Sequence, residues 1–370
     1  MDTPATMPFM KHFSAIKDHR VVGRTEHKLF DIIFIAICGS IAACDDWRTI
    51  HLWAQTKEAW LRRYCELPFG IPSSCTIRRF FRAVDPKALH AAFIEWMKEI
   101  HAALDGQSVA IDGKTLRRSF NRADGKGAIH VVSAWMSANR MVLGQLKTEE
   151  KSNEITAIPE LLKLLEIKGA IVTIDAMGCQ KAIVETIRER EADYCLTVKE
   201  NQPSLLEDVL ATFEEAPEAS MVRHTTREEG HGRIEIRSYT QISDLSRIRA
   251  ADDWVDLGSV VRVESFRFTP DGNTMETRYY ISSLSKGIRR VAKAIRDHWG
   301  IENGLHYVLD VTFKEDGSRI RKGDGAENMS TVRHVAMNFL NNARHMKLSI
   351  KNRRMAAAFD DKALEEILGF

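Results

Sequence analysis

The sequence has few of the features that mark secreted or membrane-spanning proteins. Its six cysteines form no CxxC pair, and none has a zinc-finger companion at ligand spacing. The longest apolar stretch, Leu29 to Cys44, contains Asp31 and is too short to cross a bilayer comfortably. No basic segment with an apolar run and a small-residue cleavage site is found. We therefore expect reduced thiols in a cytoplasmic protein that has no membrane partner.

A strong net charge is also absent, because 53 Lys and Arg nearly balance 51 Asp and Glu, for a formal net charge of +2. Basic residues are concentrated locally: Lys314 to Arg354 contains ten Lys or Arg against four Asp or Glu. Such a segment would suit a phosphate backbone. A solvated helical face is the alternative, and charge alone slightly favours it.

What is present is the composition of a globular protein, with 370 residues, 44% hydrophobic and 28% charged, which predicts two or three structural units. The first 105 residues have helical periodicity, with expected helices at 27–44, 47–64, 76–84 and 86–104. The helix at 76–84 carries three arginines beside two phenylalanines. It is either a DNA-reading element or a packing helix whose arginines face outward.

From Ser108 the pattern alternates between strands and helices. The expected strands are 108–112, 128–137, 140–147, 169–175 and 192–198, and the expected helices are 154–165, 179–188 and 203–213. Three strands followed by helical crossovers is the order of an RNase H-like fold, a mixed five-stranded sheet with flanking helices in which the first and fourth strands are neighbours. A strand-rich stretch at 221–285 predicts a β insertion, and a long helix at 288–311 follows it.

We therefore expect four regions along the chain. These are a helical N-terminal DNA-binding and assembly domain (1–105), the first part of the RNase H-like core (106–215), a β-rich insertion (216–286), and a completion of the core with basic C-terminal helices (287–370).

Three separated acids are the candidate catalytic groups. Asp112 in VAIDGKT and Asp175 in IVTIDAMGCQ each end an apolar strand, and Glu302 in HWGIENGLHYVLDV lies on the later amphipathic helix. In the expected strand order the two aspartates lie at the same end of neighbouring strands. Two or three carboxylates suffice to bind Mg²⁺ ions, and a pair of such ions can cleave a phosphodiester. The sequence therefore predicts a metal-dependent enzyme that acts on DNA.

Each acid taken alone also has a structural interpretation. Asp112 begins an Asp-Gly turn dipeptide, Asp175 precedes a turn, and Glu302 is an acid on a helix surface. His298 and His306 flank Glu302 at helical spacing, but no fourth ligand completes a zinc site. We expect these histidines to contact DNA phosphate or groups around a metal.

The chain resembles bacterial DDE insertion-sequence transposases of the H-repeat-associated protein type, the ISAs group. The likeness covers nearly the whole chain and is carried by the motifs IDGKTLRRS, LKTEEKSNEITAIPELL, IVTIDAMGCQ, DYCLTVKENQ, EEGHGRIEIR and IRDHWGIENGLHYVLDVTFKED. In the helical N-terminal region it is carried by DWRTIHLWA and GIPSSCTIRRFFRAVDP.

The resemblance implies that Asp112, Asp175 and Glu302 form a metal-binding triad that holds two Mg²⁺ ions, for which Mn²⁺ can substitute. It implies DNA cleavage at the ends of a mobile element and strand transfer into target DNA. The implied partners are the element's terminal repeats, target DNA and further copies of the chain, as a homodimer or larger on DNA. The implied location is the nucleoid of a bacterial cytoplasm.

The chain departs from the Tyr, Arg, Glu, Lys signature of related cut-and-paste transposases. Ile295, His298 and Leu309 stand at its Tyr, Arg and Lys positions. Candidates to replace the missing phosphate contacts are Arg296, Lys314 and Arg319, and alternative third acids are Asp310, Glu315 and Asp316.

The residues expected to contact DNA are polar or basic side chains next to these motifs. They are Lys114, Arg117, Arg118, Lys199, Asn201, Gln202, Arg233, Arg237, His298, Trp299, Arg319 and Arg321. Trp299 would stack on an unpaired base or, as the alternative, pack in the core. A catalytically silent or domesticated DNA-binding derivative, and a nuclease without strand transfer, remain the alternative functions.

Overall fold

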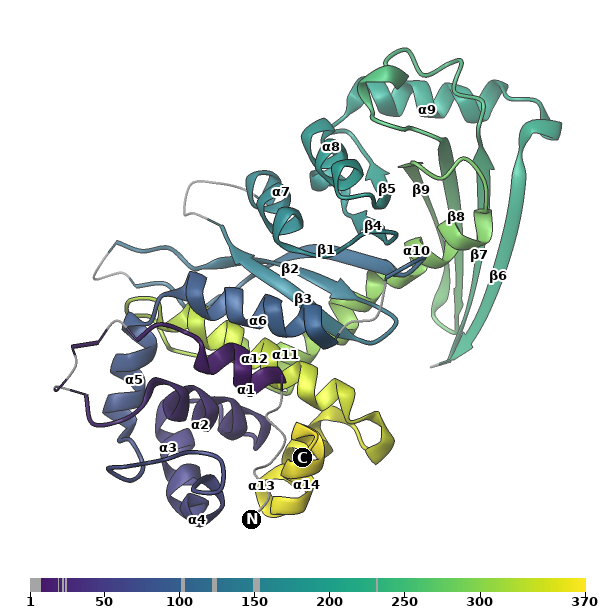
Figure 1. The fold of residues 1–370 in the computed structure, drawn as a ribbon. Helices are drawn as coiled ribbons and strands as arrows, with labels where there is room; N and C mark the ends of the chain where they lie inside the picture. The colour runs from purple at the N-terminus through teal and green to yellow at the C-terminus, as the bar shows by residue number, and fades with distance from the viewer. Residues whose placement is uncertain are drawn as a thin grey trace. The chain divides into compact units, whose positions relative to one another are not determined.

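The computed structural model describes residues 8–18, 20, 21, 23, 25–100, 104–121, 125–148, 154–230 and 232–370. The chain forms two compact units (Figure 1). The helical unit comprises Met1–Ala102, Gly113–Ser152 and Glu302–Phe370, and the sheet unit comprises Ala103–Asp112 and Asn153–Ile301. Two of the points where the chain passes from one unit to the other lie directly after Asp112 and directly before Glu302.

The strands form one mixed sheet in the order β3-β2-β1-β4-β5-β9-β8-β7-β6. Their bounds are β1 Ser108–Thr115, β2 His130–Met136, β3 Met141–Lys147, β4 Ile171–Ile174, β5 Asp193–Val198, β6 Val222–Gly230, β7 Arg233–Ile242, β8 Ser259–Thr269 and β9 Gly272–Ser282. The predicted order of strands and helices is confirmed, and β1 and β4 are adjacent and parallel as expected.

The predicted five-stranded sheet is wrong, because the sheet has nine strands. The β insertion is continuous with the core sheet: β9 pairs antiparallel with β5, from Cys195↔Ser282 to Val198↔Tyr279. In a five-stranded sheet β5 would be an edge with unpaired backbone N–H and C=O groups, and pairing with β9 removes that edge. Strand patterns predicted the strands of the insertion but not the strand on which they would pair.

Alternation along β4 determines how the sheet unit is covered. Ile171 and Thr173 face α10 (Ile288–Ile301): Ile171 shares a buried cluster with Val291 and Ile295, which recur at helical spacing. On the opposite face lie α7 (Glu154–Leu164) and α8 (Lys181–Glu189), as Figure 1 shows. Since β4 is covered on both faces, its four residues are all buried.

The helical unit is built around α12. Its helices are α1 Pro8–Ser14, α2 Leu29–Ile41, α3 Trp47–Thr56, α4 Glu58–Leu61, α5 Ser74–Ala83, α6 Pro86–Ile100, α11 Tyr307–Val311, α12 Gly325–Asn342, α13 Ile350–Phe359 and α14 Asp361–Leu368. The predicted helical character of the N-terminal region is confirmed over its described residues, although the expected helix 47–64 divides at Lys57 into α3 and α4. Nearly every residue of α12 is buried, and the Asn338 amide bonds both backbone groups of Val142 in β3 at 2.8 Å.

The local excess of positive charge from Lys314 to Arg354 is partly internal. Arg333, Arg353 and Arg354 are buried. The Arg333 guanidinium pairs with Glu315 at 3.2 Å, and that of Arg354 pairs with Asp45 at 2.7 Å. These three arginines belong neither to a phosphate-binding segment nor to a solvated face, because their guanidinium groups are buried. A buried guanidinium requires partners, and those partners are distant in the sequence.

No helix in the described part of the chain combines the length and apolar character that crossing a membrane requires.

We predict that His90 makes the helical unit sensitive to mild acid. Its Nε2 accepts the backbone N–H of Gln145 at 2.8 Å, and burial lowers the pKa of His90 to about 4. In the unfolded chain the pKa returns to its ordinary value near 6.5, so between pH 6.5 and 4 the unfolded state binds one more proton at this site. The free energy of unfolding should therefore decrease as the pH is lowered from 6.5 to 4, by about 3 kcal/mol in total.

Urea midpoints measured from pH 7 to pH 4 test this prediction. His90→Gln keeps an acceptor for the Gln145 amide but cannot gain a charge, so its stability should decline less than that of the wild type. Equal declines would contradict the assignment. His334 contributes in the same direction in both proteins, since burial lowers its pKa to about 3.

Candidate active site

The structure places Asp112 and Asp175 at one edge of the sheet. β1 and β4 pair in parallel, from Ser108↔Ile171 to Ile111↔Ile174. Each aspartate is the next residue after the last of these pairs. Asp175 directly follows β4, whereas Asp112, which was expected to end its strand, lies inside β1, which continues to Thr115. Because parallel strands end at the same edge, both carboxylates arise side by side within the sheet unit, as the strand order predicted.

Asp175 caps the turn that follows β4. Its Oδ1 accepts the backbone N–H groups of Met177 at 3.1 Å and Gly178 at 3.4 Å. Burial raises the pKa of Asp175 above its ordinary value, and these two amide bonds act against the rise. The turn also requires glycine, because a Cβ at Gly178 would lie 2.2 Å from Cγ2 of Ile174. The turn after Asp175 is therefore held close against the strand.

Two amides that follow β5 support this same turn. Asn201 donates to the carbonyl of Ala176 at 2.7 Å, and Gln202 donates to the carbonyl of Cys179 at 2.9 Å. Lys199 lies close enough for its charge to lower the pKa of Asp175. The expected position of these residues near Asp175 is confirmed. The sequence did not predict that Asn201 and Gln202 brace the turn; the polar run KENQ directly after a strand was the available signal.

Glu302 lies where the long predicted helix changes its geometry. α10 ends at Ile301, a π-helical turn spans Glu302–His306, and α11 begins at Tyr307. The prediction of one regular helix over 288–311 is therefore wrong. A π-helical turn contains an extra residue, so the positions of His298, Glu302 and His306 are not those of one regular helix.

The two histidines have different partners. His306 is buried, its Nδ1 lies 3.1 Å from Oε2 of the exposed Glu302, and burial lowers the pKa of His306. His298 belongs to α10, and its Nδ1 lies 3.0 Å from the Thr173 hydroxyl of β4. His306 thus orients Glu302, and His298 fixes α10 against β4.

Trp299 is 44% exposed, which argues against the core-packing alternative. The Arg278 guanidinium lies over its ring, 5.0 Å from the ring centroid, as in a cation–π contact. Its predicted stacking on a base stays a prediction.

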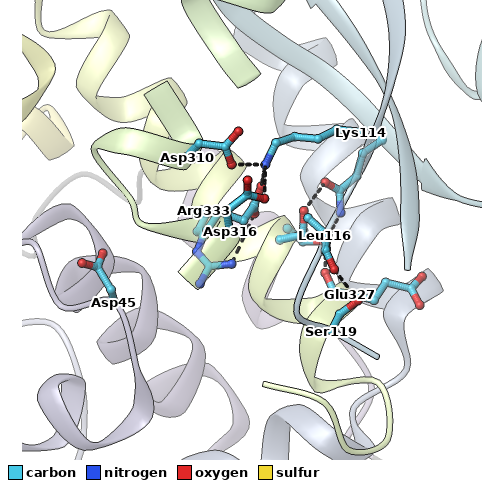
Figure 2. Close-up of polar contacts among 12 residues, drawn as sticks. Asp45, Lys114, Leu116, Ser119, Asp310, Asp316, Glu327 and Arg333 are labelled. Carbon is cyan, nitrogen blue, oxygen red and sulfur yellow. Dashed lines mark hydrogen bonds and ion pairs between the residues drawn. The ribbon is translucent and has the colours of Figure 1, made fainter. Parts of the chain in front are cut away.

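Lys114 is the centre of an ion-pair cluster, shown in Figure 2, where its ammonium points toward Asp310. Its Nζ lies 2.5 Å from Oδ1 of Asp310 and 2.7 Å from Oε2 of buried Glu315, which also pairs with Arg333. Burial opposes the charge on Lys114, but the carboxylates of Glu315 and Asp310 outweigh it and raise the pKa of Lys114. Burial likewise acts to raise the pKa of Glu315, but the cations Lys114 and Arg333 hold it below its ordinary value.

This cluster bears on the choice of the third acid. Asp310, Glu315 and Asp316 were the alternatives to Glu302, and all three are ion-paired inside the helical unit, the first two with Lys114 and Asp316 with Arg117. Glu302, by contrast, is exposed, with a side chain at 58%. The contacts therefore favour Glu302 as the acid that is available to a ligand.

The other predicted DNA-contacting residues differ in their exposure and in the contacts that they make within the protein. Arg233 is 43% exposed and pairs with Glu235 at 2.8 Å. Arg237 is 16% exposed and pairs with Glu235 and Glu228. Arg321 is half-buried, donates to the carbonyl of Arg118 and lies over the Phe120 ring. Besides Arg233 and Trp299, the exposed members of the set are Arg117, Arg118, Lys199, Asn201 and Arg319.

Sequence comparisons agree with this architecture. Residues 96–339 match the family model described as the transposase DDE domain, and residues 10–97 match the one described as DDE_Tnp_1-associated. The chain therefore belongs to the DDE transposase family, which implies an RNase H-like core for the α/β part of the fold.

Individual relatives identify the branch of the family. The chain is 42% identical over 369 residues to a putative transposase, YncI, of Escherichia coli O157:H7, covering 97% of this chain and 94% of that protein. It is 40% identical over 367 residues to an H repeat-associated putative transposase, YhhI, of Escherichia coli strain K12, covering 97% of each. The predicted resemblance to H-repeat-associated transposases is thus confirmed. A shorter similarity, 34% over 70 residues, relates 19% of the chain to 83% of an inactive transposase, YbfQ, of the same strain.

We predict that Lys114→Met destabilises the protein by about 3 kcal/mol, because it leaves buried Glu315 with Arg333 alone and removes the partner of Asp310. The matched control is Lys168→Met, which breaks the exposed pair with Glu191 and should cost less than about 1 kcal/mol. Urea unfolding at pH 7 measures both changes. Similar small losses for the two variants would show that the Lys114 cluster contributes little.

Proposed function

We propose that this protein is a transposase that cleaves DNA at the ends of its mobile element and joins the freed 3′-hydroxyl groups to target DNA. Asp112, Asp175 and Glu302 hold the metal ions for both steps. The observation that carries the proposal is the register of β1 and β4, which brings the two aspartates to one sheet edge in a chain of the DDE transposase family.

The direction of α10 supports Glu302 as the third acid. Val291 and Ile295, early in α10, pack with Ile171 at the start of β4. His298, further along the helix, bonds Thr173, further along the strand. α10 thus runs in the same sense as β4. Glu302 follows His298 by about one helical turn, roughly 5–6 Å, and Asp175 follows Thr173 by two strand residues, roughly 7 Å.

The available donors suit a hard divalent cation. Asp112, Glu302 and His306 carry suitable ligand atoms. We propose that Asp175 adds a fourth group. A set dominated by carboxylate oxygens favours Mg²⁺, for which Mn²⁺ can substitute. Two bound ions would activate water for cleavage and stabilise the leaving oxygen.

The protein's own residues prepare these ligands. The amides of Met177 and Gly178 fix Oδ1 of Asp175. Oδ2 would then be the oxygen that holds an ion. His306 holds one oxygen of Glu302, which restricts the rotamers of that side chain. Asn201 and Gln202 keep the turn after Asp175 in place. We propose that this arrangement fixes the ligands before DNA binds.

DNA is the proposed partner of the exposed basic and aromatic groups. Arg233, Trp299 and the exposed arginines near β1 and α12 are proposed to contact the terminal repeats and target DNA. The helical N-terminal region 1–105 is proposed to bind DNA and to assemble copies of the chain. The core, insertion and C-terminal regions are proposed to span 106–215, 216–286 and 287–370. Joining two element ends requires at least two copies, so a homodimer or a larger assembly on DNA follows from the proposal.

The decisive experiment is cleavage of a plasmid that carries the gene's native flanks, with Mg²⁺ or EDTA. We predict Mg²⁺-dependent nicking at the element ends that falls by about 10³-fold in Asp175→Asn and in Glu302→Gln. Asp310→Asn is the matched control and should keep most of the activity, because Asp310 pairs with Lys114.

The outcomes separate the alternatives. Full activity in Glu302→Gln together with loss in Asp310→Asn would assign the third position to Asp310. Binding of the ends without cleavage, even with Mn²⁺, would identify a silent or domesticated derivative. The similarity of part of the chain to an inactive transposase is the reason to test for this outcome. Cleavage without joined products would identify a nuclease.

A second prediction distinguishes the two arginines of β7. Arg233 is exposed at the start of the strand, whereas Arg237 is largely covered and paired with two glutamates. Arg233→Ala should weaken DNA binding and reduce the slope of log affinity against log salt by about 0.9, one phosphate contact. Arg237→Ala should lower stability with a smaller effect on that slope. Binding titrations at several salt concentrations measure this; an unchanged slope in Arg233→Ala would contradict the proposed contact.

A further inference from the structure

Two local irregularities of the helical unit, a register shift in the β2–β3 hairpin and the π-helical turn that carries Glu302, are joined by one close contact. The β2–β3 hairpin shifts register between Ala134 and Trp135. The turn itself spans Glu302–His306, and its middle residue is Gly304. A Cβ added at Gly304 would lie 2.8 Å from Cζ2 of Trp135, closer than real Cβ contacts allow. The Trp135 ring therefore packs directly on the backbone of this turn.

Space rather than conformation requires glycine at this position. Gly304 is absent from the glycines with positive φ, so its backbone is one that any residue adopts. The obstacle is the indole, which is 1% exposed and therefore enclosed by other atoms. Alanine at 304 must therefore displace either the ring or the turn, and the turn is the less enclosed of the two.

The indole is retained at this site at a cost. None of the described residues hydrogen-bonds the buried indole N–H of Trp135. A buried donor without a partner costs roughly 1–3 kcal/mol, which phenylalanine would avoid. The shift in register at Trp135 is also of the kind that re-aims a side chain, and such shifts are common next to active sites. Both observations indicate that the indole is needed at this position because it is long enough to contact Gly304.

We propose that Trp135 is a positioning residue for Glu302. Its ring, packed on Gly304, holds the π-helical turn in the shape that presents the Glu302 carboxylate and keeps His306 bonded to it. This inference deepens the proposed function, since it rests on Glu302 as a metal ligand. It predicts that metal binding responds to the fit between residues 135 and 304, while recognition of DNA does not.

The test is a double-mutant cycle in the full chain, with Gly304→Ala, Trp135→Phe and the double variant. Mn²⁺ affinity is measured by electron paramagnetic resonance, and binding of element-end DNA is measured in EDTA. Gly304→Ala should weaken Mn²⁺ binding about tenfold, a coupling within the range found for residues in contact. Trp135→Phe should weaken it about threefold, and the double variant should bind Mn²⁺ more tightly than either single variant, because the smaller ring leaves room for the new methyl group.

Gly317→Ala is the matched control, since a Cβ at Gly317 meets no atom within 4 Å, and it should bind Mn²⁺ as the wild type does. DNA binding in EDTA should stay within about twofold in all variants. Near-ultraviolet circular dichroism verifies folding. If Gly304→Ala does not fold, Trp135→Phe and the double variant still decide the question, because only the proposed fit predicts that adding the methyl group restores Mn²⁺ affinity.

Wild-type Mn²⁺ affinity in Gly304→Ala, or a double variant that binds Mn²⁺ no better than Trp135→Phe, would overturn the inference. Plasmid cleavage is assayed on the same proteins and tests the proposed function separately. The expected Mn²⁺ pattern without any cleavage by the wild type would leave the inference standing and refute the proposed cleavage. Normal cleavage and Mn²⁺ binding in every variant would refute the inference alone.

Discussion

Parallel pairing of β1 with β4 is the constraint on which the proposed chemistry depends. Four residue pairs, ending with Ile111↔Ile174, fix the strands in register, and an aspartate is the next residue on each strand after the last pair. A slip by one residue would turn one carboxylate to the other face of the sheet. β4 is covered on both faces, so burial of its apolar side chains opposes such a slip. The bonds to Asp175 and the braces from Asn201 and Gln202 then add local rigidity to a geometry that strand pairing has already set.

Buried charge is the second constraint, and it acts within the helical unit. Lys114 follows Asp112 by two residues, and Glu315 follows the turn that begins at Glu302, so their ion pair joins the two segments next to the candidate ligands. Arg333 of α12 completes the cluster from the centre of the unit. Each charge is stabilised only by the others, because removing one leaves a desolvated charge without compensation. The positions of the segments next to the candidate ligands therefore depend on the packing of α12.

The fold and the proposed activity depend on different features of this chain. The core and the sheet need only apolar spacing and strand pairing, whereas the candidate third ligand depends on a π-helical turn, a glycine and a buried indole. As a general rule, function resides in a site carried by a fold. Losing the site does not require losing the architecture, so the acids and their supporting residues are where activity is to be tested.

The sequence by itself determined the order of strands and helices, the helical N-terminal region, the adjacency of β1 and β4, and the family. These features follow from the periodicity of apolar residues and from long ordered motifs, both of which are local. Only the tertiary structure decided that β9 pairs with β5 to give nine strands, that Arg333 and Arg354 are internal, and that the helix changes geometry at Glu302. Edge pairing, burial of charge and a steric fit such as that of Gly304 with Trp135 each require partners distant in the chain. Local patterns do not contain those partners, so no local pattern could have predicted them.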